Sequence, residues 1–171
     1  MKAWLLTFLL VLPLLAQAAR PDLALEDLHG QRRPMGDYIG NGDWVVVNVW
    51  SPTCSACVRE LPSMERFHDR NKDAGVIVLG VTIDFPSFGY GRPDVIRSFL
   101  ERHPLDYPIF LADMELASEL IGHRLVAIPL TVIYHPDGRV LARWPGPINV
   151  TEIESFMENY KEYTDDWILE H

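Results

Sequence analysis

Two long runs of apolar, mostly β-branched residues stand out along the chain. Residues 44–50 read WVVVNVW and residues 76–81 read VIVLGV. Neither run alternates strongly between apolar and polar positions, which is typical of a strand covered on both faces in the middle of a sheet. Between them, residues 58–64 repeat apolar side chains at helical spacing. The pattern therefore predicts two buried strands joined by a helix, and strands connected in this way pair in parallel.

The rest of the chain continues this order without a repeat or a linker. A turn signal, proline followed by Asp137-Gly138, lies between two apolar runs and predicts an antiparallel hairpin. Thr151 and Glu154 have the spacing of a capping box and predict the start of the last helix. The expected elements are a small hairpin (22–33), a helix from Pro93, a short strand (107–111), a helix (114–121) that ends at Gly122, a hairpin (130–134 and 139–144) and a helix (151–163).

This order predicts an α/β fold with a central mixed sheet flanked by helices and an N-terminal β-hairpin extension. It also places four loops at one edge of the sheet, where ligand sites collect in such folds. These are the turn after residue 50, the loop 84–91, the segment before residue 130 and the residues 144–149.

The N-terminus carries a targeting signal. Lys2 is followed by an uncharged apolar run, residues 3–16, and by Ala16-Gln17-Ala18, a small-x-small pattern that signal peptidase cleaves. We therefore predict a signal peptide at residues 1–18 and one domain at residues 19–171. The alternative is that residues 3–16 remain as a membrane anchor, although the run is shorter than the roughly 20 residues of a typical span.

Charge excludes one class of partner. The chain has 15 Lys and Arg against 24 Asp and Glu, a formal net charge of −9. Polyanion binding needs a basic surface that releases counterions, so no nucleic-acid partner is expected.

The cysteines carry the candidate chemistry. The chain has 2 cysteines, Cys54 and Cys57, and they lie where the first buried strand passes into a helix. A thiolate is the species that attacks a disulfide, and the N-terminus of a helix favours the thiolate at Cys54. Cys57 lies one turn later, close enough to attack the mixed disulfide. Because the protein is expected to be exported and has no other cysteine, we predict that the pair is redox-active.

A cysteine pair of this spacing has three other uses in proteins. Structural zinc needs four ligands, and the nearest downstream histidine, His68, has no companion close by. Covalent haem requires histidine directly after the second cysteine, where Val58 stands. A purely structural disulfide is the remaining alternative, but so short a loop removes little entropy from the unfolded chain.

Residues 50–62, WSPTCSACVRELP, resemble the active-site region of the TlpA/ResA/CcmG (DsbE) group of thioredoxin-like thiol–disulfide oxidoreductases. The similarity extends through most of residues 22–160. The resemblance implies a thioredoxin-like fold and an exported or membrane-tethered reductase of partner disulfides, such as those of apocytochrome c or of copper-site proteins. It also implies electrons from a membrane thiol donor and no metal or organic cofactor besides the redox disulfide. We further expect a monomer.

The resemblance also implies roles for individual residues. Ile128-Pro129 matches the family's cis-proline, which lies beside the cysteines and exposes backbone to a substrate strand, and Trp50 and Thr53 belong to the same expected substrate surface. Thr53 replaces the tryptophan usual in the family. Glu60 matches the active-site glutamate of ResA-type proteins, where it would raise the pKa of Cys57 and relay its proton, and its alternative is a solvated surface residue.

Two other functions use a cysteine pair or a reactive cysteine. A copper chaperone would hold Cu(I) between the two cysteines, but no methionine or histidine ligand lies near the pair. A thiol peroxidase would need a wider proline-threonine-cysteine spacing than Pro52-Thr53-Cys54 provides. Phe85, Phe88 and Tyr90 lie in the loop 84–91 and either form a docking patch or pack onto the domain.

Overall fold

The computed structural model describes residues 23–170, so the predicted signal segment 1–18 and the alternative anchor 3–16 lie outside the described residues. Within residues 23–170, no helix combines the length and the apolarity needed to cross a membrane. The strands are β1 (Ala24–Asp27), β2 (Arg32–Pro34), β3 (Trp44–Trp50), β4 (Val76–Thr82), β5 (Ile109–Leu111), β6 (Leu130–Tyr134) and β7 (Val140–Pro145). The helices are α1 (Ser55–Asn71), α2 (Pro93–Leu100), α3 (Met114–Ile121) and α4 (Val150–Glu170), with short 3-10 turns at Met35–Asp37 and Lys72–Ala74.

The strands of the described residues form one mixed sheet in the order β2-β1-β5-β4-β3-β6-β7. β3 pairs in parallel with β4, and β4 pairs in parallel with β5. β6 and β7 form the predicted antiparallel hairpin beside β3. The predicted N-terminal hairpin is confirmed as β1 and β2, and β1 also joins the sheet by antiparallel pairing with β5.

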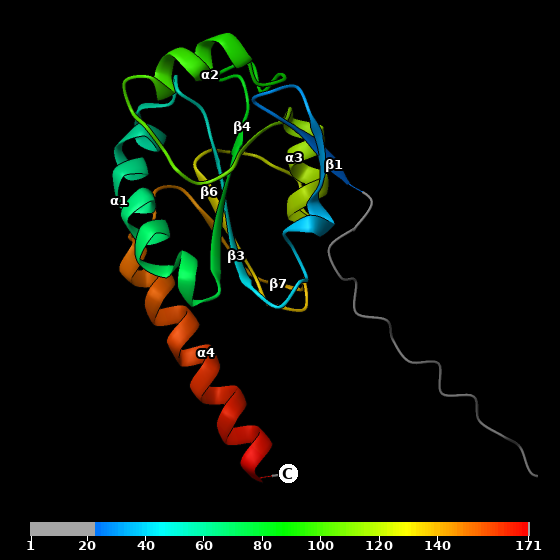
Figure 1. Cartoon of the computed structure of the whole chain (residues 1–171), viewed down its shortest axis with the longest axis vertical. Coiled ribbons are helices and arrows are strands. Elements are labelled where there is room, and N and C mark those ends of the chain that lie inside the picture. The colour runs from blue at the N-terminus through cyan, green and yellow to red at the C-terminus, as the bar shows by residue number, and fades with distance from the viewer. Residues whose placement is uncertain (1–22, 171) are drawn as a thin grey trace, which may run out of the picture.

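The helices cover both faces of the sheet (Figure 1). Successive side chains of a strand point to opposite faces, so Val45, Val47 and Val49 contribute to one core, and Val46 and Trp50 to the other. The first core packs against α3 and the second against α1, α2 and α4. β3 is buried along its whole length, so it holds the turn that follows its carboxyl end in a defined position.

The four loops predicted to share one edge of the sheet do meet there. Thr53, in the turn after β3, donates a hydrogen bond from Oγ1 to the backbone oxygen of Phe85, at 2.7 Å. On the other side, the N–H of Gly146 donates to the oxygen of Pro129, at 2.8 Å. The N–H of Ile148 donates to the carboxylate of Glu60, at 3.1 Å.

The start of the last helix differs from the prediction. α4 begins at Val150, and Asn149 caps it by accepting the N–H of Thr151 at 3.1 Å. The N–H of Asn149 in turn donates to Glu152 at 3.1 Å, so the capping box is formed by Asn149 and Glu152. The predicted capping box of Thr151 and Glu154 is therefore wrong. Glu154 instead forms an ion pair with Arg70 at 2.6 Å. The helix also continues past the predicted end, to Glu170.

Candidate active site

A disulfide between Cys54 and Cys57 lies at the junction of β3 and α1. Cys54 is the N-cap of α1, and its Sγ accepts the N–H of Cys57 at 3.2 Å. In the reduced protein this N–H and the positive end of the helix dipole favour a thiolate at Cys54. The side chain of Cys54 is 5% exposed and that of Cys57 is 0% exposed, so Cys54 is the sulfur that a partner can reach first.

The segment before β6 approaches Cys54 directly. The Ile128–Pro129 bond is cis, as predicted, and the oxygen of Ile128 lies 4.0 Å from the Sγ of Cys54. Within the described residues, the backbone N–H groups of 126–128 donate no hydrogen bond to another backbone group. This stretch therefore presents free backbone beside the sulfur, as a strand-binding segment requires.

On the other side of the disulfide, α1 carries a buried carboxylate. Glu60 lies one turn after Cys57 on the side of α1 that faces the sheet, and it is only 6% exposed. Oε1 of Glu60 accepts from Nδ2 of Asn48 at 2.8 Å, and Oε2 accepts from the N–H of Ile148 at 3.1 Å. The alternative of a solvated surface glutamate is therefore wrong.

Burial sets the protonation behaviour of Glu60. Desolvation disfavours the charged form and raises the pKa of Glu60 above its ordinary value of 4.5, while the hydrogen bonds from Asn48 and Ile148 partly oppose this shift. A carboxyl group with a raised pKa, one helical turn from a thiol, can accept a proton from that thiol and return it.

Asn48 connects Glu60 to the hairpin. Its Nδ2 also donates to Oγ1 of Thr131 at 3.2 Å, while its Oδ1 is buried without a hydrogen-bond partner among the described residues. A flip of the amide would bring Oδ1 to the same two groups, where it can accept from a protonated Glu60 and from the hydroxyl of Thr131. Asn48 can thus partner Glu60 in either protonation state, and in the flipped orientation its Nδ2 takes the position that has no partner among the described residues.

No role was predicted for Asn48 or Thr131. A signal was present for Asn48, because it is the one polar residue in the apolar run of residues 44–50. A buried polar group needs a partner, so its position predicts a hydrogen bond. The identity of that partner depends on how α1 and β6 pack against β3.

Thr53 is exposed and connects two of the loops. Its Oγ1 lies 3.0 Å from Oγ of Ser51 and donates to the oxygen of Phe85. The rings of Phe85 and Phe88 meet edge to face with centroids 5.7 Å apart, and each packs against one of the two cores. These two aromatics are therefore partly buried and pack onto the domain, while Tyr90 is 41% exposed.

The predicted substrate contact of Trp50 is not supported. Its side chain is 0% exposed and packs against Phe99, with ring centroids 5.5 Å apart. Trp50 is the last residue of β3 and points into the core on the side of α1. Its side chain therefore offers no surface to a substrate and lies in the core below the turn that follows β3.

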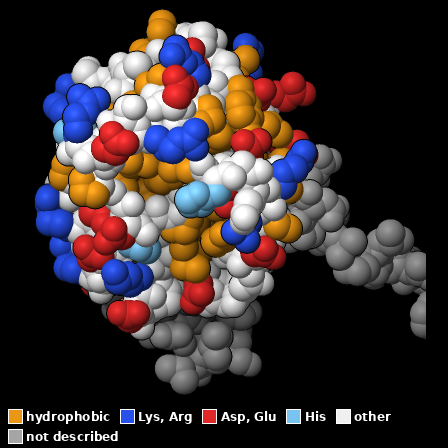
Figure 2. Space-filling view, turned by 45° about the horizontal axis from the view of Figure 1, so that its top comes forward, with side chains coloured by type: hydrophobic (Ala, Val, Ile, Leu, Met, Phe, Trp, Pro, Cys, Tyr) orange, Lys and Arg blue, Asp and Glu red, His pale blue; other side chains and the backbone are white. Residues whose placement is uncertain are grey.

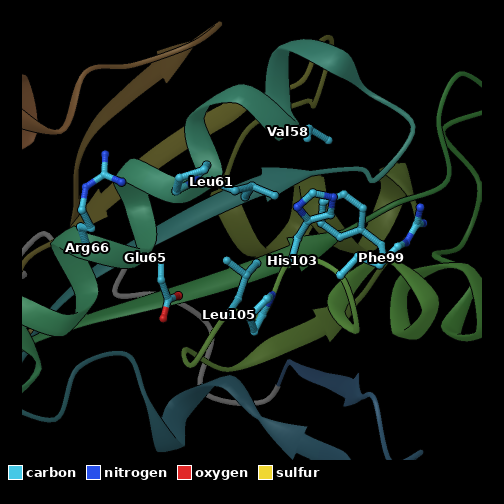
Figure 3. Close-up of a pocket in the computed structure, with 10 residues that line it drawn as sticks. Val58, Leu61, Glu65, Arg66, Phe99, His103 and Leu105 are labelled. Carbon is cyan, nitrogen blue, oxygen red and sulfur yellow. The ribbon is translucent and has the colours of Figure 1, made fainter.

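A cavity of about 370 Å³ lies along α1 and α2 (Figure 3). Its apolar lining comes from Val58, Leu61, Phe99 and neighbouring residues, and its charged lining has both signs, with Glu65 beside several cations. The oxygens of Glu65 also accept the N–H of Asp106 at 3.0 and 3.1 Å. This mixed lining favours no single class of ligand.

Figure 2 turns the top of the molecule in Figure 1 towards the reader and shows the face where the loops at the carboxyl end of β3 meet. Apolar side chains gather across the middle of this face, with charged side chains of both signs arranged around them. An apolar centre with a charged rim is the usual arrangement of a protein-binding surface.

Comparison with known proteins places this site in a family. The model of the AhpC/TSA family matches residues 16–143. The chain belongs to this family. Within it, the chain is similar to the thiol–disulfide oxidoreductase ResA of Geobacillus kaustophilus, with 29% identity over 141 residues, which cover 82% of this chain and 75% of ResA. The predicted TlpA/ResA/CcmG relationship is therefore confirmed.

Solved structures show the same fold. A thiol:disulfide interchange protein of the thioredoxin family from Chlorobium tepidum superposes with a TM-score of 0.68 at 17% identity, covering 82% of this chain and 94% of that chain. StoA from Bacillus subtilis superposes with a TM-score of 0.60 at 18% identity, covering 81% and 98%. The predicted thioredoxin-like fold is confirmed, and the Cys54–Cys57 pair fits the redox function of an oxidoreductase.

Proposed function

We propose that the protein is an exported dithiol reductant that transfers electrons from a membrane thiol donor to disulfides of other exported proteins. The observation that carries this proposal is the placement of the pair, with Cys54 at a helix N-terminus and Cys57 on the side of a buried carboxylate. The relatives named ResA are thiol–disulfide oxidoreductases, which supports the reaction class. As clients we propose proteins of the cytochrome c maturation or copper-site type. The pair serves as the only redox group, without a metal or organic cofactor, and the protein acts as a monomer.

Each step of the proposed reaction uses a group of this chain. The thiolate of Cys54 attacks one sulfur of the client disulfide, so that a mixed disulfide forms and the other client sulfur leaves as a thiolate and takes up a proton. Cys57 then loses its proton to the carboxylate of Glu60 and attacks Cys54. The second client sulfur leaves as a thiolate and takes up the proton that Glu60 holds, and two electrons have passed to the client while the Cys54–Cys57 disulfide has formed.

The client chain would be held by hydrogen bonds to the backbone of the segment before Pro129. Ile128 lies beside Cys54 with a cis bond to Pro129, and the N–H groups before Pro129 are free of backbone partners within the described residues. A client segment can pair there as an added strand, with Thr53 at its other side.

The test is an electron-transfer measurement on the purified protein. The reduced protein should reduce the disulfides of insulin, and its potential against glutathione should lie well below the roughly −120 mV of a strong oxidant. Thiol trapping in cells should find the pair largely reduced. A potential near that of a strong oxidant, or a largely oxidised pair in cells, would contradict the direction of transfer.

The same preparation distinguishes the other functions. Copper retained through purification under reducing conditions, without insulin reduction, would indicate a chaperone. Rapid consumption of peroxide would indicate a peroxidase.

A further inference from the structure

A recess of about 310 Å³ opens beside the segment that faces Cys54. It lies between the chain that precedes β6 and the end of β7. Its lining includes Leu130 and Pro145, which form a cross-strand pair, and the exposed side chain of Val126. Leu130 directly follows Pro129, and the oxygen of Ile128 is 4.0 Å from the Sγ of Cys54. A polypeptide bound at Cys54 therefore reaches this recess within a few residues, because an extended chain advances about 3.3 Å per residue.

The charged lining of the recess has one sign. Its charged and ionisable residues are His123, Arg124 and Arg143, and none of the acidic residues that the structure describes lines it. This is unusual for a chain with a formal net charge of −9, and it contrasts with the cavity of Figure 3, where Glu65 lies among the cations. The recess is therefore a local positive site on an acidic protein.

The two arginines are free to bind an anion. Arg143 donates from Nε to the oxygen of Ile121 at 2.8 Å, which fixes the guanidinium and leaves its other N–H groups available. Within the described part of the chain, neither Arg124 nor Arg143 forms an ion pair with a carboxylate. A fixed guanidinium with free donors matches a carboxylate in geometry as well as in charge.

The apolar part of the recess limits the ligand further. Val126 is 71% exposed, and together with Ala127, Leu130 and Pro145 it provides an apolar surface next to the cations. A ligand that fits has a carboxylate on a short apolar stem and a neighbouring apolar group. An aspartate or glutamate side chain of a polypeptide, with an apolar residue next to it, meets this description.

We propose that the recess binds an aspartate or glutamate of the client polypeptide, located within a few residues of the cysteine that Cys54 attacks. This inference rests on the proposed reductase function and specifies which clients the protein prefers. The bound carboxylate holds the client chain over Ile128 while its disulfide is attacked, so the recess affects the rate of encounter and docking rather than the exchange chemistry.

The test uses disulfide-bonded peptides that differ at one position close to the cysteine. Peptides with glutamate, glutamine or lysine at this position are reduced by the reduced protein, and the second-order rate constant is measured for each. The glutamate peptide should react about fivefold to tenfold faster than the lysine peptide at low salt, and the ratio should shrink towards one in about 0.5 M NaCl.

Two charge-reversing substitutions distinguish an effect of the recess from an effect of the net charge of the protein. Arg124→Glu should invert the preference in favour of the lysine peptide. Arg66→Glu makes the same change in net charge in the cavity of Figure 3 and should leave the preference intact. Equal rates for all peptides in the wild type, or equal effects of the two reversals, would overturn the proposal. If no peptide is reduced at all, the proposed function itself is wrong and this inference falls with it.

Discussion

The two sulfurs of the disulfide meet different surroundings, although they are joined by one bond. Cys54 faces the loops at the edge of the sheet, with the oxygen of Ile128 4.0 Å away. Cys57 is fully buried and lies on the side of α1 that carries Glu60 and its partner Asn48. The first side offers backbone and surface to a client, and the second offers a carboxyl group whose pKa burial raises. The comparison separates client recognition from proton transfer, and single substitutions can test this division.

The largest expected effect distinguishes the two cysteines themselves. Cys54→Ser should abolish the reduction of a client disulfide, because the attacking thiolate is lost. Cys57→Ser should still react once and then accumulate a mixed disulfide, because nothing resolves it. Mass spectrometry of each variant after incubation with a disulfide peptide measures this difference. Adducts on Cys57 in the Cys54→Ser variant would show that burial does not protect the second sulfur.

A second carboxyl group in the buried cluster should have the next largest effect. Asn48→Asp places it beside Glu60, where two like charges cannot both form, so the pKa of one must rise strongly. The free energy of unfolding should fall by about 3 kcal/mol at neutral pH. Because a carboxyl group with a raised folded-state pKa stabilises the fold only while protonated, most of the loss should be recovered near pH 4.

Urea unfolding of Asn48→Asp at both pH values measures this effect, and Asn48→Ala is the matched control. The alanine variant removes the same amide without adding a charge. Parallel pH profiles for the two variants would show that the cluster is solvated in solution.

Glu60→Gln should slow the exchange by roughly tenfold and lower the pKa of Cys57, because the proton acceptor and its negative charge are both removed. Glutamine fits the site if the amide of Asn48 flips, since its unpartnered Oδ1 can then accept from the new amide. Alkylation rates as a function of pH give the thiol pKa. Glu65→Gln is the control, because Glu65 lies on the same helix and its pKa is also raised by burial.

The same variant tests the burial of Glu60 through stability. Folding favours the protonated form, so the contribution of Glu60 is complete below its unfolded pKa and is lost as the pH rises through the folded value. Glu60→Gln should therefore gain stability relative to the wild type as the pH rises. Superimposable alkylation curves and a stability difference independent of pH would contradict both roles.

The smallest effect is expected on the side of Cys54. Thr53→Val removes the hydrogen bond to the oxygen of Phe85 while keeping the shape of the side chain, at a cost of about 1 kcal/mol. The rates of amide hydrogen exchange in the loop 84–91 should increase, while the pKa of Cys57 should stay unchanged. A shift of that pKa would show that the two sides of the disulfide are coupled.

The sequence predicted most of the elements because their signals are local. The apolar run of residues 44–50 indicates a buried strand, and the turn at Asp137-Gly138 indicates the hairpin, where Gly138 has a φ of 86°. The pairing of β1 with β5 was not predicted, because nothing in either short strand specifies a partner far along the chain. The start of α4 was misplaced for a different reason, since Asn149 and Glu152 have the same local spacing as Thr151 and Glu154, and the structure uses the earlier pair.

The redox pair, its place at a strand-to-helix junction and the alternation of strands and helices could be predicted from the chain, because periodicity, turn residues and helix polarity act over a few neighbouring residues. The surroundings of the pair depend on tertiary packing. Glu60 is buried because Asn48, 12 residues away, and Ile148, 88 residues away, provide donors for its two oxygens. A buried carboxylate is tolerated only with such partners, and packing alone brings groups this far apart in the chain together.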